Sequence, residues 1–283
     1  MCFPNGKQLG GAPCNFAYHT SQAGCESYVV SALGTDTSGD EIIARFHELG
    51  LDSSYVQRNA GFPTGTVTVT VDNHGIPSYI IHENVAWDNI GWTPALEALA
   101  KTMDAVCFGS LAQRNAVSKQ SILNFLQTTK KDCLRVFDIN LRQHFYDTDT
   151  IIQSLRLANI LKLNEDELPV VADLLKLEGN DDELLSVLID RFSLELIALT
   201  KGGKGSILLT KKEQSFVDVP RVKIADTVGA GDSFTAMLVA GLLKKAELKK
   251  IHETATRVAA FVCTQQGATP RLPQSELDGL FDK

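Results

Sequence analysis

Residues 225–243 read "ADTVGAGDSFTAMLVAGLL", and this stretch predicts a tight turn that leads into a buried helix. Gly229, Ala230 and Gly231 stand directly before one carboxylate, Asp232, and an apolar run follows. A helix start leaves backbone N–H groups unpaired at its positive end, and small side chains let an anion approach them. Either the glycines only permit tight packing and Asp232 caps the helix, or the turn holds an anion beside a proton acceptor. The second arrangement is typical of group transfer.

Upstream of this turn, short apolar strands alternate with helical segments. Strands are expected at 104–110, 134–140, 159–164, 194–200 and 205–210, and helices at 118–129, at 148–158 and in the segments between 165 and 192. Continuous apolar strands separated by helices indicate an α/β fold with a mostly parallel sheet that helices cover on both faces.

Polar residues follow four of these strands directly, at 109–110, 138–142, 164–167 and 200–203. In a parallel sheet the carboxyl ends of the strands meet at one edge, and ligands bind there. The four segments and the glycine turn therefore predict a shared cleft.

The first third of the chain has a different pattern. A helix is expected at 15–23, a strand at 27–34, and a helix at 38–50 that Ser38 and Glu41 cap. In the segment 65–81, Thr and Val alternate, "DNHG" follows, and a second β-rich run returns. This pattern predicts an antiparallel hairpin, which as an insertion would serve as a lid or an oligomer contact.

Composition narrows the functional classes. The net charge of −7 and the pI of about 5.4 argue against a nucleic-acid surface, and no basic membrane face is evident. The longest apolar run is too short to span a bilayer, and the first residues, "MCFPNGKQLGG", do not resemble a secretion signal, so we expect a cytoplasmic protein. The six cysteines form no Cys-x-x-Cys pair and are expected to be free thiols.

The segment "DTVGAGDSF" at 226–234 resembles the C-terminal signature of the ribokinase-like (PfkB) carbohydrate kinases. Two N-terminal segments agree: "LGGAPCNFA" at 9–17 is similar to the family's sugar-binding segment, and "ALGTDTSGDEI" at 32–42 to the turn that follows it. "PTGTV", "VAWDNI", "FGSLAQR" and "DINLRQ" resemble the bacterial fructokinase branch. The resemblance implies one domain over 1–283, a three-layer sandwich with a mostly parallel central sheet, and a small antiparallel β lid inserted at about 62–90.

The resemblance also implies a role for each matching residue. Asp232 would be the base that takes the proton of a sugar hydroxyl, and Gly229, Ala230 and Gly231 would form the anion hole for the transferred phosphoryl group. The nucleotide would contact Asn164, Thr200, Gly202, Gly205 and Gly231. Glu167, in the Asn-x-x-Glu arrangement with Asn164, would hold Mg²⁺ through water.

For the sugar, the family pattern implies Gly10, Gly11, Asn15, Asn140, Arg142 and, more weakly, Gln113. Arg114 is either a further sugar ligand or one half of a surface ion pair. A monovalent cation, K⁺, would bind near the anion hole at Asp226, Val228, Val262, Gln265 and Gly267, mostly through carbonyl oxygens. Arg271 stands where relatives carry a small hydroxyl residue, which weakens the case for this cation.

One feature departs from the family pattern. Relatives begin with a β-strand that ends in Gly-Glu and with an Asp that binds sugar hydroxyls, whereas this sequence starts at "MCFPNGK". We therefore expect the first strand of the family's sheet to be missing, which would expose a groove in the sheet.

Taken together, these patterns predict transfer of the γ-phosphoryl group of MgATP to a sugar hydroxyl, with fructose as the leading substrate. The alternatives are a kinase for 2-keto-3-deoxygluconate, ribose or a nucleoside, and a catalytically inactive regulator that binds sugar or nucleotide on the same fold. The hairpin would exclude water as a lid and join two chains in a homodimer, with an exposed Trp87 reaching towards the partner.

Overall fold

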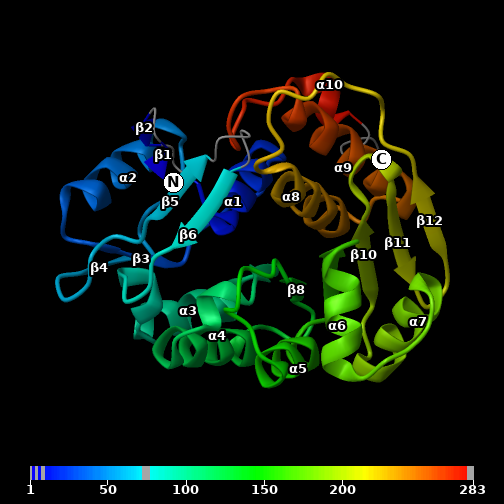
Figure 1. The fold of residues 1–283 in the computed structure, drawn as a ribbon, viewed down its shortest axis with the longest axis horizontal. Helices are drawn as coiled ribbons and strands as arrows, with labels where there is room; N and C mark the ends of the chain where they lie inside the picture. Colours follow the sequence, from blue (N-terminus) through cyan, green and yellow to red (C-terminus); the bar gives the residue numbers. More distant parts are fainter. Residues whose placement is uncertain (1, 4–5, 8–9, 72–76, 279–283) are drawn as a thin grey trace.

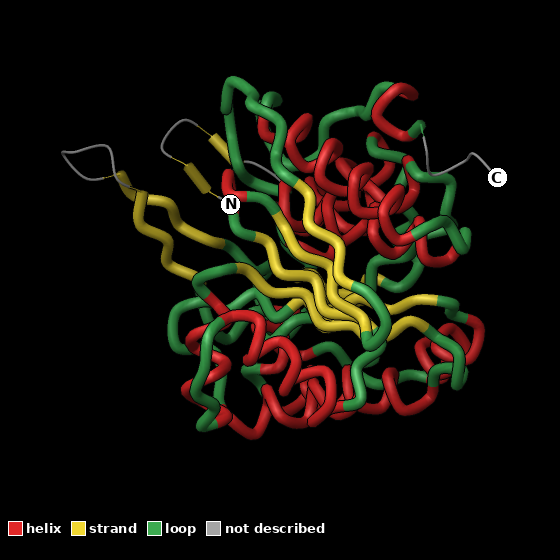
Figure 2. The backbone as a smooth tube through the Cα atoms, turned by 90° about the vertical axis from the view of Figure 1, so that its right-hand side faces the viewer, coloured by secondary structure: helices red, strands yellow, loops and turns green. Residues whose placement is uncertain are grey.

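A computed structural model describes residues 2–3, 6–7, 10–71 and 77–278 of the chain. A twisted sheet runs through the middle of the molecule, and helices lie on both of its faces, as Figure 2 shows. Within the described residues, no helix combines the length and the apolar character needed to cross a membrane.

The central sheet has six strands in the order β12-β11-β10-β9-β8-β7. Their bounds are β7 Ala105–Phe108, β8 Leu134–Asp138, β9 Ile160–Asn164, β10 Leu196–Thr200, β11 Ser206–Thr210 and β12 Gln214–Val217. The four strands from β7 to β10 are parallel to one another, and β11 and β12 continue the sheet antiparallel. The predicted mostly parallel sheet is therefore confirmed, and β12 is a strand that the sequence did not reveal.

Two groups of helices form the outer layers, and Figure 1 shows them on either side of the strands. One group packs on the sheet face that carries Val136, Ile160 and Leu196, and it contains α1 Ala12–Gln22, α8 Ala230–Leu243, α9 Leu248–Cys263 and α10 Gln274–Leu277. The other group contains α3 Pro94–Thr102, α4 Ala116–Thr128, α5 Thr148–Leu157, α6 Glu167–Leu175 and α7 Asp181–Phe192. Alternate residues of each strand thus enter two separate apolar cores.

The N-terminal third adds two small sheets. The bounds of its elements are β1 Cys2–Phe3, β2 Gly6–Lys7, β3 Ser31–Gly34, α2 Thr37–Glu48, β4 Val56–Asn59, β5 Val67–Val71 and β6 Pro77–Ile81. The strands β5 and β6 pair antiparallel, so the predicted hairpin is confirmed, although its "DNHG" turn lies within 72–76, outside the described residues. Short 3₁₀ turns complete the chain: η1 Ala86–Asn89, η2 Leu111–Gln113 and η3 Gly202–Lys204.

The strands β3 and β4 pair parallel in a sheet of their own, and β7 is the last strand on its side of the central sheet. This arrangement does not test whether the family's first strand is missing, so that expectation stays a prediction. The expected strand at 27–34 is shorter in the structure, because Tyr28 makes only a single bridge with Asp52 before β3 begins at Ser31.

The cap of α2 is a correction. Asp36, two residues before the predicted Ser38, accepts a hydrogen bond from the Gly39 amide at 2.8 Å. The same carboxylate also accepts bonds from the amide and hydroxyl of Thr64, at 2.8 and 2.6 Å. Asp36 is the better cap because it ties the helix start to the segment that leads into the hairpin, a partner that the local sequence does not reveal.

The five cysteines whose side chains are described, Cys14, Cys25, Cys107, Cys133 and Cys263, are free thiols. Burial raises the pKa of each of them, to about 12 at Cys14 and well above the usual value at Cys107. They therefore pack as small apolar side chains rather than as reactive thiolates.

Candidate active site

The glycine turn of residues 229–231 forms the start of α8. Gly229 adopts a left-handed backbone with φ of 83°, and a Cβ atom built on it would lie 2.7 Å from the carbonyl oxygen of Ala268. Only glycine fits such a position without displacing the backbone. The turn is therefore held tightly against the loop that follows α9.

Two backbone amides in this turn have no carbonyl partner within the part of the chain that the structure describes. The Ala230 amide donates a long bond of 3.3 Å to Thr227, whereas the amides of Gly231 and Asp232 have no backbone acceptor. They lie at the positive end of a 14-residue helix. The turn consequently offers an anion two free N–H groups.

Asp232 lies in the first turn of α8 and is only partly exposed. Its Oδ2 accepts a hydrogen bond of 2.7 Å from Nδ2 of Asn15, a residue 217 positions earlier in the chain. Burial raises the pKa of Asp232 to about 6, and the negative charge of Asp138 adds to this effect, while Asn15, Lys162 and Arg142 oppose it. A carboxyl group with this pKa is mostly ionised at pH 7 and still basic enough to accept a proton.

Asn15 comes from α1, which begins after Gly11 at a φ of 134°. The side chain is 2% exposed, and its Oδ1 has no hydrogen-bond partner. A buried acceptor without a donor is uncommon in folded proteins and points to a missing partner such as a hydroxyl group. The predicted sugar-binding segment therefore meets the predicted base.

A buried ion pair lies beneath the glycine turn. Nζ of Lys162, on β9, is 3.0 Å from Oδ1 of Asp138 at the end of β8, and the two side chains are 9% and 8% exposed. Oδ2 of Asp138 accepts a hydrogen bond of 2.9 Å from the hydroxyl of Thr235 on α8. A Cβ atom built on Gly231 would lie 3.2 Å from the Lys162 ammonium, so the pair touches the turn from below.

Sequence reasoning singled out neither Lys162 nor Thr235. The signal was present in "NILKLN", where one lysine interrupts an apolar strand two residues before Asn164. A charge inside a buried strand needs a partner, and here it has one.

Asn164 and Glu167 make reciprocal contacts at the start of α6. Oδ1 of Asn164 accepts a bond from the Glu167 amide, and Oε2 of Glu167 accepts one from the Asn164 amide, each at 2.9 Å. Oε1 of Glu167 accepts a third bond of 2.9 Å from the Leu141 amide. The Asn-x-x-Glu pattern thus works as a capping box that also fixes the loop after β8.

This geometry fits magnesium only through water. Glu167 is 5% exposed, and both of its oxygens already accept backbone bonds. No group of three or more His, Cys, Asp or Glu side chains gathers as a metal site anywhere in the described residues. Magnesium keeps several waters and needs few protein carboxylates when phosphate oxygens supply the rest, so the donor set is compatible with it.

The predicted nucleotide residues Thr200, Gly202 and Gly205 lie at the end of β10 and in the loop that joins it to β11. The Lys201 amide donates to the Gly205 carbonyl at 2.9 Å, and Gly205 has a φ of 102° that places it against Phe216 and the Val217 carbonyl. The lysines of this loop make surface ion pairs, Lys201 with Asp181 and Lys204 with Glu165.

Asn140 and Arg142 follow β8. Asn140 adopts a left-handed backbone with φ of 45°, and Arg142 is exposed and near enough to Asp232 to lower its pKa. Gln113, in contrast, is buried, and its Nε2 donates to the Gly109 carbonyl and to the Ser154 hydroxyl of α5, each at 2.9 Å. Among the described hydrogen bonds, none joins Gln113 to another predicted sugar residue.

Arg114 and Trp87 correct two expectations. Arg114 is buried rather than on the surface, and its guanidinium donates to both oxygens of Asp88, at 2.7 and 2.9 Å. The guanidinium stacks 4.1 Å from the Trp87 ring and 4.5 Å from the Phe145 ring. Trp87 is therefore half-buried beside Arg114 and packs over Gly65, where any Cβ atom would collide with it.

The segments predicted to hold K⁺ lie together. Cys263, at the end of α9, accepts a backbone bond of 2.8 Å from Ala225, and the Gly267 amide donates to Oδ2 of Asp226 at 3.2 Å. The Val228 amide donates to Oδ1 of the same aspartate at 3.0 Å. These bonds hold the two segments of the predicted K⁺ site side by side.

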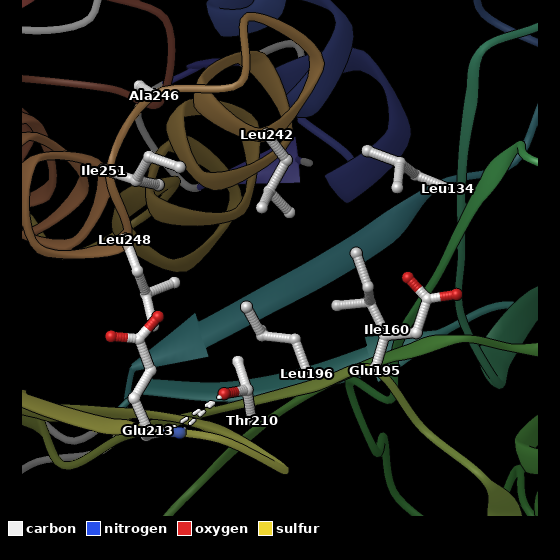
Figure 3. Close-up of a pocket in the computed structure, with 10 residues that line it drawn as sticks. All are labelled: Leu134, Ile160, Glu195, Leu196, Thr210, Glu213, Leu242, Ala246, Leu248 and Ile251. Carbon is white, nitrogen blue, oxygen red and sulfur yellow. Dashed lines mark hydrogen bonds between the residues drawn. The ribbon is translucent and has the colours of Figure 1, made fainter.

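A cavity of about 280 Å³ lies near the amino ends of the parallel strands, and Figure 3 shows the residues that line it. The amino-terminal residues of three parallel strands, Leu134, Ile160 and Leu196, line it together with residues of α8 and α9 such as Leu242 and Ile251. None of the predicted site residues lines this cavity. The polar cluster and this cavity are thus at different ends of the same strands.

Comparison with known proteins gives one family. A sequence profile of the pfkB family carbohydrate kinases matches residues 5–275. An uncharacterized sugar kinase of Pyrococcus horikoshii, PH1459, is 30% identical over 277 residues, which are 94% of this chain and 84% of that protein. A fructokinase of Klebsiella pneumoniae is 28% identical over 282 residues, 94% of this chain and 89% of its own.

Solved structures agree with the sequence comparison. The PH1459 crystal structure matches with a TM-score of 0.80 at 27% identity and covers 93% of this chain and 84% of that one. The fructokinase of Xylella fastidiosa with bound ATP matches with a TM-score of 0.84 at 22% identity, over 96% and 89%. These matches confirm the ribokinase-like fold.

Proposed function

The chain belongs to the pfkB family of carbohydrate kinases, and we propose that it transfers the γ-phosphoryl group of ATP to a hydroxyl of fructose. The observation that carries this proposal is the contact of 2.7 Å between Asn15 and Asp232, beside an Asn15 Oδ1 that has no partner. One sugar hydroxyl would give its proton to Asp232, and a second hydroxyl of the same sugar would donate a hydrogen bond to Oδ1 of Asn15.

The proposed reaction needs one proton transfer. Asp232, with a pKa raised by burial to about 6, takes the proton of the attacking hydroxyl, and the sugar oxygen displaces ADP from the γ-phosphorus. The free amides of Gly231 and Asp232 face the charge on the migrating phosphoryl group, with Gly229 and Ala230 shaping the turn. Positioning and electrostatics supply most of the rate enhancement in phosphoryl transfer.

The nucleotide would lie along the loops after β9 and β10, where Asn164, Thr200, Gly202 and Gly205 gather at the carboxyl ends of adjacent strands. Magnesium would be held by Glu167 through water, and it would neutralise phosphate charge when bound. Potassium would lie between the loops of Asp226 and Gly267 and strengthen the positive field at the turn.

The sugar would be bound by Gly10, Gly11 and Asn15 before and within α1, and by Asn140 and Arg142 from the loop after β8. We propose that residues 62–90 act as a lid, that two chains form a homodimer through it, and that the enzyme is cytoplasmic. The half-exposed Ile80 on β6 gives the lid an apolar side chain that a second chain could cover.

An ADP-release assay tests the substrate. The purified protein is incubated with MgATP and fructose, 2-keto-3-deoxygluconate, ribose or a nucleoside, and fructose is expected to give the highest kcat/KM. A higher value for another acceptor would replace fructose in this proposal, and no stimulation by any acceptor would favour a regulator that binds without catalysis.

The Asn15→Leu variant tests the observation itself. This substitution keeps the size of the side chain and removes both polar atoms, so the KM for fructose is expected to rise at least about tenfold while the KM for ATP changes little. The matched control is Asn124→Leu on α4, a residue of the other helical layer whose amide oxygen accepts a bond from Gln120. An equal change in both KM values at Asn15 would contradict the assignment.

A further inference from the structure

Lys162 is a lysine inside an apolar strand. Its neighbours Leu161 and Leu163 are fully buried in the core on one face of the sheet, so strand alternation places Lys162 on the other face, which α8 covers. Ile160 and Leu196 on that face pack in the same core as α8. A charged group is costly in such a place, so its position calls for a reason beyond packing.

The lysine is linked to the glycine turn through a chain of contacts. Its ammonium pairs with Asp138, Asp138 accepts a bond from Thr235, and the Thr235 hydroxyl is also 3.0 Å from the Gly231 carbonyl. A Cβ atom built on Gly231 would lie 3.2 Å from the ammonium, so the lysine occupies the space next to this glycine. Two strands and the first turns of α8 thus meet at one cation directly below the turn.

The charges around this cation are strongly unbalanced. Asp138, Glu167 and Asp232 surround Lys162, and although burial alone would lower the pKa of the lysine, these three carboxylates raise it above its usual value. Lys162 therefore stays protonated. A migrating phosphoryl group adds further negative charge at the same point, and without the lysine the carboxylates would repel it.

We propose that Lys162 is a positioning residue for phosphoryl transfer, supporting the glycine turn from below and balancing the carboxylates so that Asp232 stays ionised while phosphate is bound. This inference rests on the proposed kinase function. A purely structural ion pair would hold β8 and β9 together without any influence on the ionisation of Asp232.

Several groups face Asp232, and only two of them, Asp138 and Lys162, change charge in the proposed test. The groups are Cys14 and Asn15 on α1, Cys107 on β7, Asp138 on β8, Arg142 after β8 and Lys162 on β9. Asp138 raises the pKa of Asp232 and Lys162 lowers it. Removing each charge in turn should therefore shift the pH dependence of kcat in opposite directions.

The experiment measures kcat against pH for wild type, Lys162→Met and Asp138→Asn. The acid limb of the profile, where Asp232 loses its proton, is expected to move up by about one pH unit in Lys162→Met and down in Asp138→Asn. Thr235→Val is the matched control, because it removes the hydrogen bond to Asp138 without changing any charge, and its limb is expected to stay at the wild-type pH.

The outcomes separate this inference from the proposed function. No sugar-dependent ADP release by wild type at any pH would contradict the kinase assignment itself. An active wild type whose acid limb stays fixed in the two charge variants, or moves the same way in both, would overturn the role of Lys162. Where Lys162→Met does not fold, the Asp138→Asn profile decides alone, with a downward shift in support and an unchanged limb against.

Discussion

The two ends of the strands β8, β9 and β10 have opposite character. At their amino ends stand Leu134, Ile160 and Leu196, which line a cavity of about 280 Å³ that Glu195, Thr210 and Glu213 border as well. At their carboxyl ends stand Asp138, Asn164 and Thr200, and a buried ion pair, a capping box and a glycine loop lie there. Each of these strands is five residues long, so only three residues separate the two end residues.

The cavity and the buried ion pair therefore lie at different ends of the strands. The apolar end has the cavity and costs the fold little, because its side chains are the ones that burial favours. The polar end places a lysine and several carboxylates below or beside the glycine turn, where desolvation opposes stability. A fold keeps such a cluster where charge must be moved or held, so the polar end is the better candidate for catalysis.

The largest expected effect concerns Asp232. Asp232→Asn is expected to lower kcat by roughly 100- to 10,000-fold, because the amide cannot accept the proton of the sugar hydroxyl. Calorimetric titration with a non-hydrolysable ATP analogue is expected to give an unchanged Kd. A kcat comparable with that of wild type would contradict the assignment of the active site to the carboxyl ends of the strands.

The glycine turn gives the next largest effect. Gly229→Ala is expected to lower kcat by about 100-fold, since the new Cβ would lie 2.7 Å from the Ala268 carbonyl at a φ of 83° and displace the amides. Gly91→Ala is the control, because its Cβ would meet only Gln57 Oε1, at an ordinary 3.6 Å. Equal activity of the two variants would contradict the role of the turn.

The pH dependence of kcat reports the same carboxylate. Because burial raises the pKa of Asp232 to about 6, kcat is expected to be level above that pH and to fall about tenfold for each pH unit below it. Steady-state rates between pH 4.5 and 8.5 with saturating substrates measure this limb. A limb near pH 4 would mean that the carboxyl group is as well solvated as an ordinary aspartate.

The raised pKa also predicts a stability effect. A carboxyl group with a pKa of 3.8 in the unfolded chain and about 6 in the folded one favours folding less as pH rises from 4 to 6, and this cost persists above pH 6. Asp232→Asn is therefore expected to raise Tm by a few degrees at pH 8 and hardly at all at pH 4. Melting curves by circular dichroism at the two pH values check the sign, and destabilisation at pH 8 would reverse it.

The sequence predicts the central layers well because buried parallel strands and their helices depend on local apolar patterns. The strands from β7 to β11 and the helices α4, α5 and α8 lie within a few residues of their expected positions. It also predicts that Asn15 and Asp232 belong to one site. Elements with mixed or short patterns are not predicted from the sequence. One of them is β4, which reads "VQRN" and is held in place by pairing with β3.

What the sequence cannot predict depends on partners from distant segments. Asp36 caps α2 because Thr64 also binds it, and Arg114 is buried because Asp88 and Trp87 enclose it. Lys162 has its place because Asp138 and Thr235 come from another strand and another helix. In each case a polar group is stabilised by a contact of more than 20 residues in sequence separation, which no local pattern encodes.

The smallest expected effect tests the apolar end. Leu242→Phe adds volume beside Ile160 and Leu196, and because it fills part of the cavity it is expected to raise Tm by about 1 to 4 °C. Since none of the predicted site residues lines this cavity, kcat and both KM values are expected to stay within about twofold of wild type. A large fall in kcat with an intact fold would show that the two ends of the strands are coupled, because a change at one end would then reach Asp138 and Lys162 through the strands that they share.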